Sequence, residues 1–491
     1  MGADAISIGG GWGVHRAGCG VGRLDKRLRR VASSGAGVAL TLRGRRQVGK
    51  SRLVREFCDR AGVPYVFSTA TKGAPPVQAV GAFLGDLRES GLPADPTLVP
   101  GPSAASWPEV FRALAAALPT TPSIVVMDEV PWLAEQDALF DGALQTAWDR
   151  LLSSRPVLLL LVGSDPRMME QLTAYDRPFF GRADNMVLAP LNVAEIGRVL
   201  GLDASDAVDA QLVSGGLPGI VRTWPHATPA LEFLREGAAD PAAAVFGIPE
   251  SVLLAEFPNP DTARRVIEAV GAGERTHADI AASAGSRGAE VPSGTLSPLL
   301  RRLVEEKRVL AVDQPLSTRP GKPALYRVAD SNLRLYLGVL RMVQEQARRG
   351  RPEAGFRLIE RRWPTWRGRA VGPLVRESLE LAAGDDRLPW PRVESVGGWW
   401  NRRFDPEVDL VGADREPIAD TVSFVGSIKW LGGPFDHHDL TALRHAAVEV
   451  PGFDRDKTGT VIASLNGTSV DLDLTGSLLW TPQDLIDSWS S

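Results

Sequence analysis

The sequence predicts an α/β protein built on a parallel sheet. Three short apolar runs, Val38–Leu42, Ser123–Met127 and 156–164, each have the length of one buried strand. A helix-like stretch from Arg52 to Ala61 follows soon after the first run. At 491 residues the chain also exceeds the ~250–300 residues at which single hydrophobic cores stop growing. We therefore expect three or four domains, with the parallel sheet in the first of them.

The first apolar run leads into a glycine loop with the pattern of a phosphate-binding loop. The loop reads Gly44-Arg45-Arg46-Gln47-Val48-Gly49-Lys50-Ser51. Glycines let backbone N–H groups wrap phosphates, and the N-terminus of the following helix adds a positive dipole. We expect Lys50 to reach the β and γ phosphates of a nucleotide and Ser51 to hold Mg²⁺. The alternative is a chance match in a glycine-rich chain.

Polar residues follow the other two runs. Because open α/β sheets place ligands at the carboxyl ends of their strands, Asp128 is expected at the Mg²⁺ held by Ser51, and Glu129 at the attacking water. The alternative is a solvated strand end with two acids. Ser164 ends the third run and is a candidate to touch the γ-phosphate or the water, with a purely structural role equally open. Arg182 either answers charge on the transferring phosphate or makes a surface salt bridge.

The middle of the chain predicts a winged helix. Helices are expected over 261–270, 278–284 and from Ser293 onward, because apolar residues recur at helical spacing in each of the longer stretches. Strands are expected at 309–312 and 325–328, joined by a proline-bounded wing. Basic and acidic residues nearly balance here, so contact with DNA and packing against a nucleotide domain both remain open.

The following segment, 331–370, is rich in arginine. Trp363 and Trp366 are interleaved with these arginines, a combination that suits a nucleic-acid phosphate track. The alternative is a helical connector clamped to acidic residues of the same chain.

The C-terminal part predicts a second α/β domain. A helix over 373–382 precedes strands at 393–400, 407–411 and 422–428; a further helix at 439–447 and a strand at 460–465 come next. Asn466-Gly467 predicts a hairpin turn into a strand at 469–474.

Together, these motifs resemble the archaeal-type ATPases, AAA-like members of the STAND group of P-loop NTPases. The residues that carry the resemblance, in family order, are Gly22-Arg23, Gly44 to Ser51, Asp128-Glu129, Val162-Gly163-Ser164, Gly181-Arg182 and Gly215-Gly216-Leu217-Pro218. The resemblance implies a P-loop NTPase parallel sheet, a helical lid, a winged helix and a C-terminal nuclease-like domain. It also implies that ATP and Mg²⁺ bind the loop, with Arg23 nearby. The expected domains are 1–19 as an extension, 20–192 as the ATPase domain, 193–256 as the lid, 257–330 as the winged helix, 331–368 as the basic connector and 369–491 as the nuclease-like domain.

The last domain resembles the PD-(D/E)XK nuclease core, with one departure. The matching positions are Glu377, Asp409 and Lys429, but Ser427 stands where that core has a metal-binding acid two residues before the lysine. Losing one of two carboxylates weakens the attraction for a hard dication. Glu407, on the same strand face as Asp409, is a candidate to compensate. We therefore expect a degenerate site with no nuclease activity.

Composition limits the remaining choices. The formal net charge of −4 gives no global attraction to nucleic acid, and the two cysteines cannot form a disulfide framework. No apolar run is long enough to span a membrane, so a cytoplasmic protein is expected. The predicted function is an ATP-hydrolysing molecular switch, with DNA, a protein partner or further copies of the chain as candidate partners. The alternatives are an ATP-licensed DNA nuclease and an ATP-binding adaptor that does not hydrolyse.

Overall fold

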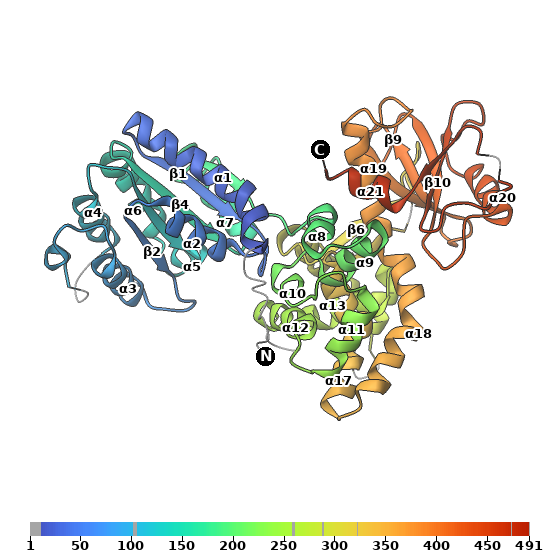
Figure 1. Cartoon of the computed structure of the whole chain (residues 1–491), viewed down its shortest axis with the longest axis horizontal. Coiled ribbons are helices and arrows are strands. Elements are labelled where there is room, and N and C mark those ends of the chain that lie inside the picture. The colour runs from blue at the N-terminus through green and yellow to red at the C-terminus, as the bar shows by residue number, and fades with distance from the viewer. Residues whose placement is uncertain are drawn as a thin grey trace, which may run out of the picture. The chain divides into compact units, whose positions relative to one another are not determined.

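The computed structural model describes residues 11–101, 106–257, 261–286, 289–321, 323–472 and 474–490. The predicted extension 1–19 therefore lies partly outside the described residues, and its remainder belongs to the first helix. The chain divides into two compact units, at residues 1–190 and 191–491. Figure 1 shows the helices and strands of both units.

The first unit is a five-stranded parallel sheet with helices. Its elements are α1 (Gly11–Ser34), β1 (Val38–Arg43), α2 (Lys50–Ala61), β2 (Tyr65–Thr69), α3 (Pro76–Glu89), η1 (Pro96–Leu98), α4 (Trp107–Ala117), β3 (Ser123–Asp128), α5 (Val130–Gln136), α6 (Phe140–Ala147), η2 (Trp148–Leu152), β4 (Val157–Gly163), α7 (Pro166–Leu172) and β5 (Ala183–Val187). The strand order is β2-β3-β4-β1-β5, and every pairing is parallel. This is the P-loop NTPase fold class, and the prediction of the fold class is confirmed.

Burial explains why the central strands read as continuous apolar runs. Every residue of β3 and β4 is buried, because helices cover both faces of the sheet. On one face, alternate residues such as Val125 and Leu159 pack with Phe111 and Phe140 from α4 and α6. β3 and β4 are neighbours, so their carboxyl ends, where Asp128 and Ser164 stand, meet at one edge.

The second unit begins with helices. They are α8 (Val193–Leu200), α9 (Ala204–Ser214), α10 (Pro218–Val221), α11 (Ala230–Ala239) and α12 (Ala244–Glu256). Then come α13 (Thr262–Ala272), α14 (His277–Ser283), α15 (Ser293–Arg301), η3 (Arg302–Glu306), β6 (Leu310–Asp313) and β7 (Leu325–Val328), with β6 and β7 antiparallel. The predicted helices and strands of 261–330 are thus confirmed as elements. Asp261 and Thr276 each accept a backbone hydrogen bond as N-caps, as expected for helix starts.

The unit continues into a helical segment and a second sheet. The elements are α16 (Ser331–Leu335), η4 (Tyr336–Leu340), α17 (Arg341–Arg348), α18 (Pro352–Ala370), α19 (Gly372–Gly384), β8 (Ser395–Trp400), β9 (Glu407–Ala413), β10 (Val422–Lys429), α20 (His437–Ala447), β11 (Gly459–Ser464), β12 (Ser477–Trp480) and α21 (Pro482–Asp487). The sheet order is β12-β11-β10-β9-β8. β8, β9 and β10 are antiparallel, whereas β11 and β12 run parallel to β10.

The predicted hairpin after β11 is wrong. Thr468 makes only an isolated bridge to Phe435, and the next strand is β12, which pairs parallel to β11. The Asn466-Gly467 turn signal is local, whereas the pairing of β12 is decided by distant residues.

Within the described residues, no single helix is long and apolar enough to cross a membrane. α11 and α12, which are bent by 76° at their junction, pass that test only as a pair, by length and composition.

Candidate functional site

The loop between β1 and α2 has a backbone that the sequence motif requires. Gln47 and Gly49 adopt left-handed conformations, with φ of 68° and 90°. At Gly44 a Cβ atom would lie 2.4 Å from the carbonyl oxygen of Leu188, so a side chain does not fit there. The loop therefore passes tightly against neighbouring backbone before α2 begins at Lys50.

Lys50 is buried at the start of α2, and its ammonium turns back onto the loop. Nζ donates hydrogen bonds to the carbonyl oxygens of Gly44, at 2.7 Å, and Arg45, at 2.9 Å. Burial lowers the pKa of Lys50 to about 8, although the charges of Glu129 and Asp128 oppose this shift. Lys50 is therefore a cation held inside the loop, at the cost of part of its hydration.

Ser51 and Asp128 are brought together, as the sequence predicts. Asp128 is the last residue of β3 and is buried. Burial raises the pKa of Asp128, and a hydrogen bond from the Ser51 side chain acts in the opposite direction. A hydroxyl next to a carboxylate is a donor set that Mg²⁺ accepts when phosphate and water complete its shell. No group of three His, Cys, Asp or Glu side chains within the described residues is arranged to hold a metal ion, so protein carboxylates alone do not form a cage here.

Glu129 stands in a strained backbone conformation next to Asp128. Its φ of 56° and ψ of 40° are left-handed, which is unfavourable for a residue with a Cβ atom. Its Oε2 accepts hydrogen bonds from the Oγ of Ser164, at 2.8 Å, and from the backbone N–H of Ser164, at 3.3 Å. Ser164 thus holds the Glu129 carboxylate, a partner that the sequence did not reveal.

Arg182 is fully occupied by its own neighbourhood. Its Nε and Nη2 donate to the two carboxylate oxygens of Asp149, both at 2.8 Å. Nη1 donates to the carbonyl oxygens of Pro178 and Phe180. The salt-bridge alternative thus describes the contacts of this arginine, and contact with a phosphate would require it to leave Asp149. Arg23 is an exposed residue of α1.

The motif Gly215 to Pro218 joins α9 to α10. Gly215 ends α9 with a left-handed backbone, and a Cβ there would lie 3.2 Å from an Asp330 carboxylate oxygen. Asn332 Nδ2 donates to the carbonyl oxygen of Val213 at 2.9 Å. The motif therefore provides the close approach of α9 to α16 within the second unit.

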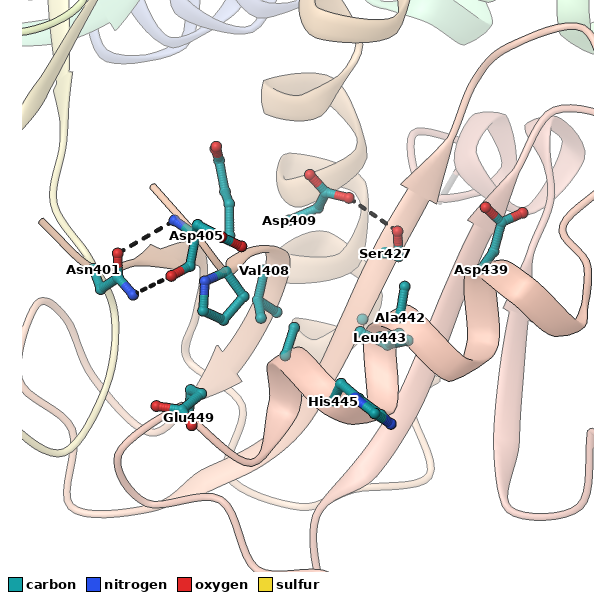
Figure 2. Close-up of a pocket in the computed structure, with 14 residues that line it drawn as sticks. Asn401, Asp405, Val408, Asp409, Ser427, Asp439, Ala442, Leu443, His445 and Glu449 are labelled. Atoms are coloured by element: carbon teal, nitrogen blue, oxygen red, sulfur yellow. Dashed lines mark hydrogen bonds between the residues drawn. The ribbon is translucent and has the colours of Figure 1, made fainter. Parts of the chain in front are cut away.

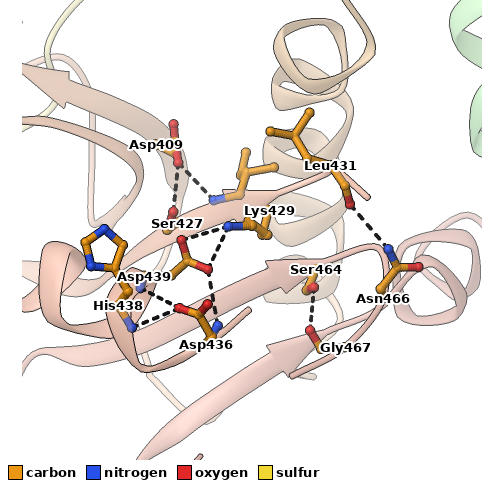
Figure 3. Close-up of polar contacts among 11 residues, drawn as sticks. Asp409, Ser427, Lys429, Leu431, Asp436, His438, Asp439, Ser464, Asn466 and Gly467 are labelled. Atoms are coloured by element: carbon orange, nitrogen blue, oxygen red, sulfur yellow. Dashed lines mark hydrogen bonds and ion pairs between the residues drawn. The ribbon is translucent and has the colours of Figure 1, made fainter. Parts of the chain in front are cut away.

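In the second unit, Asp409 on β9 and Ser427 on β10 are bonded to each other. Asp409 Oδ2 accepts from Ser427 Oγ at 3.0 Å and from the Ile428 N–H at 2.9 Å, as Figures 2 and 3 show. Arg376 of α19 donates to the carbonyl oxygen of Asp409 at 3.1 and 2.8 Å. Burial raises the pKa of Asp409, so that the negative form is disfavoured. One carboxylate oxygen is thus taken up by the serine that replaces the expected acid.

Lys429 pairs with an acid that the sequence analysis missed. Its Nζ lies 2.8 Å from both carboxylate oxygens of Asp439, in the first turn of α20 (Figure 3). Asp439 also forms a reciprocal capping box with Asp436, a pattern that is visible in the sequence. The capping pattern does not, however, indicate the contact with Lys429 across the sheet.

The other two acids near this site have different surroundings. Burial raises the pKa of Glu377 on α19, and the nearby charge of Glu380 raises it further. Glu407 forms an ion pair with Arg275 at 3.4 Å. Glu407 is therefore already neutralised in part, which weakens it as a substitute for the missing carboxylate.

A cavity of about 710 Å³ lies over these residues. Figure 2 shows Asp409, Ser427 and Asp439 along it, with His445 and Glu449 further down α20 and after its end. The volume is within the range of ligand sites, ~300–1,000 Å³.

The arginine-rich segment is partly clamped, and its tryptophans are packed. Arg341 pairs with Glu268, Arg348 with Glu250 and Arg367 with Asp209. The rings of Trp363 and Trp366 stack on each other at 5.5 Å, and Trp363 is buried. Their packing within the protein argues against a base-stacking platform.

Comparison with known proteins finds similarity only among solved structures. No protein-family model and no curated protein sequence matches the chain. The Walker-type ATPase PABY2304 of Pyrococcus abyssi is 20% identical, with 65% of this chain and 94% of that chain covered and a TM-score of 0.47. The ORC2 protein of Aeropyrum pernix, described in ADPNP and ADP complexes, is 14% identical over 68% of this chain and 93% of that chain, with a TM-score of 0.43. The ORC1 protein of the same organism, in complex with DNA, is 15% identical over 68% and 92%, with a TM-score of 0.34. At such low identities and TM-scores the likeness carries no argument about what this chain binds or does.

Proposed function

We propose that the chain binds ATP with Mg²⁺ at the loop 44–51 and hydrolyses it, acting as a nucleotide-dependent switch. The observation that carries this proposal is the convergence of five side chains at one edge of the parallel sheet: Lys50, Ser51, Asp128, Glu129 and Ser164. The preference for ATP over other nucleotides rests on the family resemblance alone.

Each side chain has a role that its contacts support. Lys50 would exchange its bonds to the loop carbonyls for bonds to phosphate oxygens, which are better partners for a buried cation. Ser51 and Asp128 would hold Mg²⁺, which supplies charge neutralisation when bound. Glu129, oriented by Ser164, would accept a proton from the attacking water.

A steady-state ATPase assay tests the proposal. Wild type should release phosphate in the presence of Mg²⁺, and Lys50→Ala should not. Glu135→Gln is the matched control, because Glu135 is an exposed acid on α5, six residues from Glu129. Wild-type turnover in Lys50→Ala would refute the site, whereas phosphate release by wild type and Glu135→Gln at equal rates supports it.

We further propose that the second unit responds to the nucleotide. In this reading 193–256 is a helical lid, 257–330 a winged helix, 331–368 the connector and 369–491 a nuclease-like domain. The helix-helix-helix-strand-strand order of 261–330 favours the winged helix. Limited proteolysis with and without a non-hydrolysable ATP analogue tests the coupling. An identical cleavage pattern in Lys50→Ala with and without analogue, against a changed one in wild type, is the expected result.

A DNA nuclease is the second candidate function, and one observation favours it. α19, three antiparallel strands, α20 and a parallel strand place Asp409 and Lys429 beside a cavity. The Ser427–Asp409 bond and the Lys429–Asp439 ion pair argue against it. We expect no cleavage of plasmid or linear DNA with Mg²⁺ or Mn²⁺, with or without ATP. Cleavage that Asp409→Ala abolishes would replace the switch by an ATP-licensed nuclease.

A third reading is an adaptor that binds ATP without hydrolysis. ATP binding by wild type without any phosphate release would favour this reading over the switch.

A further inference from the structure

Arg334 on α16 is a buried cation without a counter-charge of its own. It is largely enclosed by protein, with a minor part of its surface open. Among the residues that the structure describes, its guanidinium has no hydrogen-bond or ion-pair partner. Burial lowers the pKa of Arg334 to about 10, and repulsion by Arg327 and Arg275 adds to the shift. Buried charges in proteins are normally paired, so this one calls for a partner.

The groups nearest to Arg334 are mostly further arginines. Arg327, Arg275 and Arg369 lie close enough to repel its charge, and Asp313 is the acid that attracts it. Asp313 is already paired with Arg327, at 3.1 Å. Arg275 is paired with Glu407 and is thereby accounted for. Arg369 is exposed near the end of α18, and no described residue pairs with it. Arg334 and Arg369 therefore leave a local excess of positive charge.

The backbone fixes this cluster in place. The Tyr326 N–H donates to the carbonyl oxygen of Arg275 at 2.8 Å, which places Arg275 beside β7 and Arg327. Trp400 Nε1 donates to the carbonyl oxygen of Pro323 at 2.8 Å, which ties the segment before β7 to β8. The cluster is thus built by the β6–β7 hairpin, α16, the end of α18 and β9, and it lies wholly within the second unit.

We propose that Arg334 and Arg369, with Arg275 and Arg327 around them, bind a phosphate group. Guanidinium groups present planar forks of N–H donors that match phosphate oxygens, and a dianion would compensate the excess charge. The same chemistry is offered by a phosphodiester of DNA and by a free phosphorylated small molecule. The site is separate from the loop 44–51, and the proposal does not rest on ATP hydrolysis.

Isothermal titration calorimetry with inorganic phosphate tests the proposal on the full chain. All proteins carry Lys50→Ala, which removes the response of the phosphate loop, and ionic strength is held constant with chloride. Phosphate should bind this parent protein, and Arg334→Gln should weaken the binding about tenfold or more, because bonds to charged groups are lost. Arg334→Lys keeps the charge without the fork and should give an intermediate loss.

Arg357→Gln is the matched control. Arg357 is an exposed residue of α18 with no partner among the described residues, and the substitution removes the same charge. It should leave the phosphate affinity unchanged. If Arg334→Gln fails to fold by circular dichroism, the exposed Arg369→Gln carries the test, with a similar loss expected.

A short DNA duplex added to the phosphate titration distinguishes the two sources. Competition by the duplex that Arg334→Gln or Arg369→Gln removes indicates a phosphodiester, and phosphate binding without competition indicates a small phosphorylated ligand. The proposal is overturned if the parent protein does not bind phosphate, if the Arg334 and Arg369 variants bind it as the parent does, or if Arg357→Gln loses as much affinity as they do.

Discussion

The lowered pKa of Lys50 predicts that nucleotide affinity depends on pH in a defined window. Only the charged ammonium attracts phosphate oxygens, and burial lowers its pKa to about 8 in the free protein. Bound phosphates favour the charged form, so binding above pH 8 takes up a proton. The dissociation constant for ATP should stay constant below pH 8 and then rise about tenfold per pH unit. If bound phosphate restores the ordinary pKa of 10.5, the total loss approaches about 300-fold.

Equilibrium binding of a fluorescent ATP analogue between pH 6.5 and pH 10 measures this profile. The terminal phosphate itself ionises near pH ~6, below the window. Lys50→Arg is the control, because a guanidinium stays charged throughout and should give a flat, weaker profile. A flat wild-type profile above pH 8, or an equal decline in Lys50→Arg, would refute the assignment of the ammonium to the phosphates.

Three further predictions follow from contacts in the two units. Ser164→Ala should lower ATP turnover about 10- to 100-fold with little change in ATP affinity, because Glu129 loses a hydrogen bond of 2.8 Å; a matching loss of affinity in binding assays would contradict the positioning role. Arg367→Ala should destabilise the protein by about 3 kcal/mol at pH 8 in chemical denaturation, because Asp209 is left buried and unpaired; exposed Arg361→Ala should change stability little. Burial raises the pKa of Asp209 to about 6, so the loss in Arg367→Ala should shrink as the pH falls toward 5 and the carboxyl group takes up its proton; a constant loss would contradict this.

The sequence predicts elements well where one residue pattern decides the outcome. β1, β3 and β4 were expected within about two residues of their observed bounds, because strands buried on both faces leave continuous apolar runs. β2 was not predicted, because only alternate residues of Tyr65–Thr69 are buried and the run is short. β12 was misplaced, because a local turn signal competes there with a long-range parallel pairing.

The candidate site is predictable for the same reason and to the same extent. Lys50, Ser51 and Asp128 follow from motif spacing and the rule that strand ends meet at one edge. The Ser164–Glu129 bond depends on the left-handed backbone of Glu129, for which no local residue pattern exists. The Lys429–Asp439 and Arg182–Asp149 ion pairs join different elements, so they emerge only when those elements pack.

A single-turnover experiment on Glu129→Gln tests the central claim most directly. Radiolabelled ATP is mixed with excess protein and Mg²⁺, and bound nucleotide and released phosphate are measured in the same samples for wild type and variant. The account predicts that wild type binds ATP and converts it to ADP, while Glu129→Gln binds it with similar affinity and retains it as ATP. Hydrolysis at the wild-type rate by Glu129→Gln, or no ATP binding by either protein, would contradict the account.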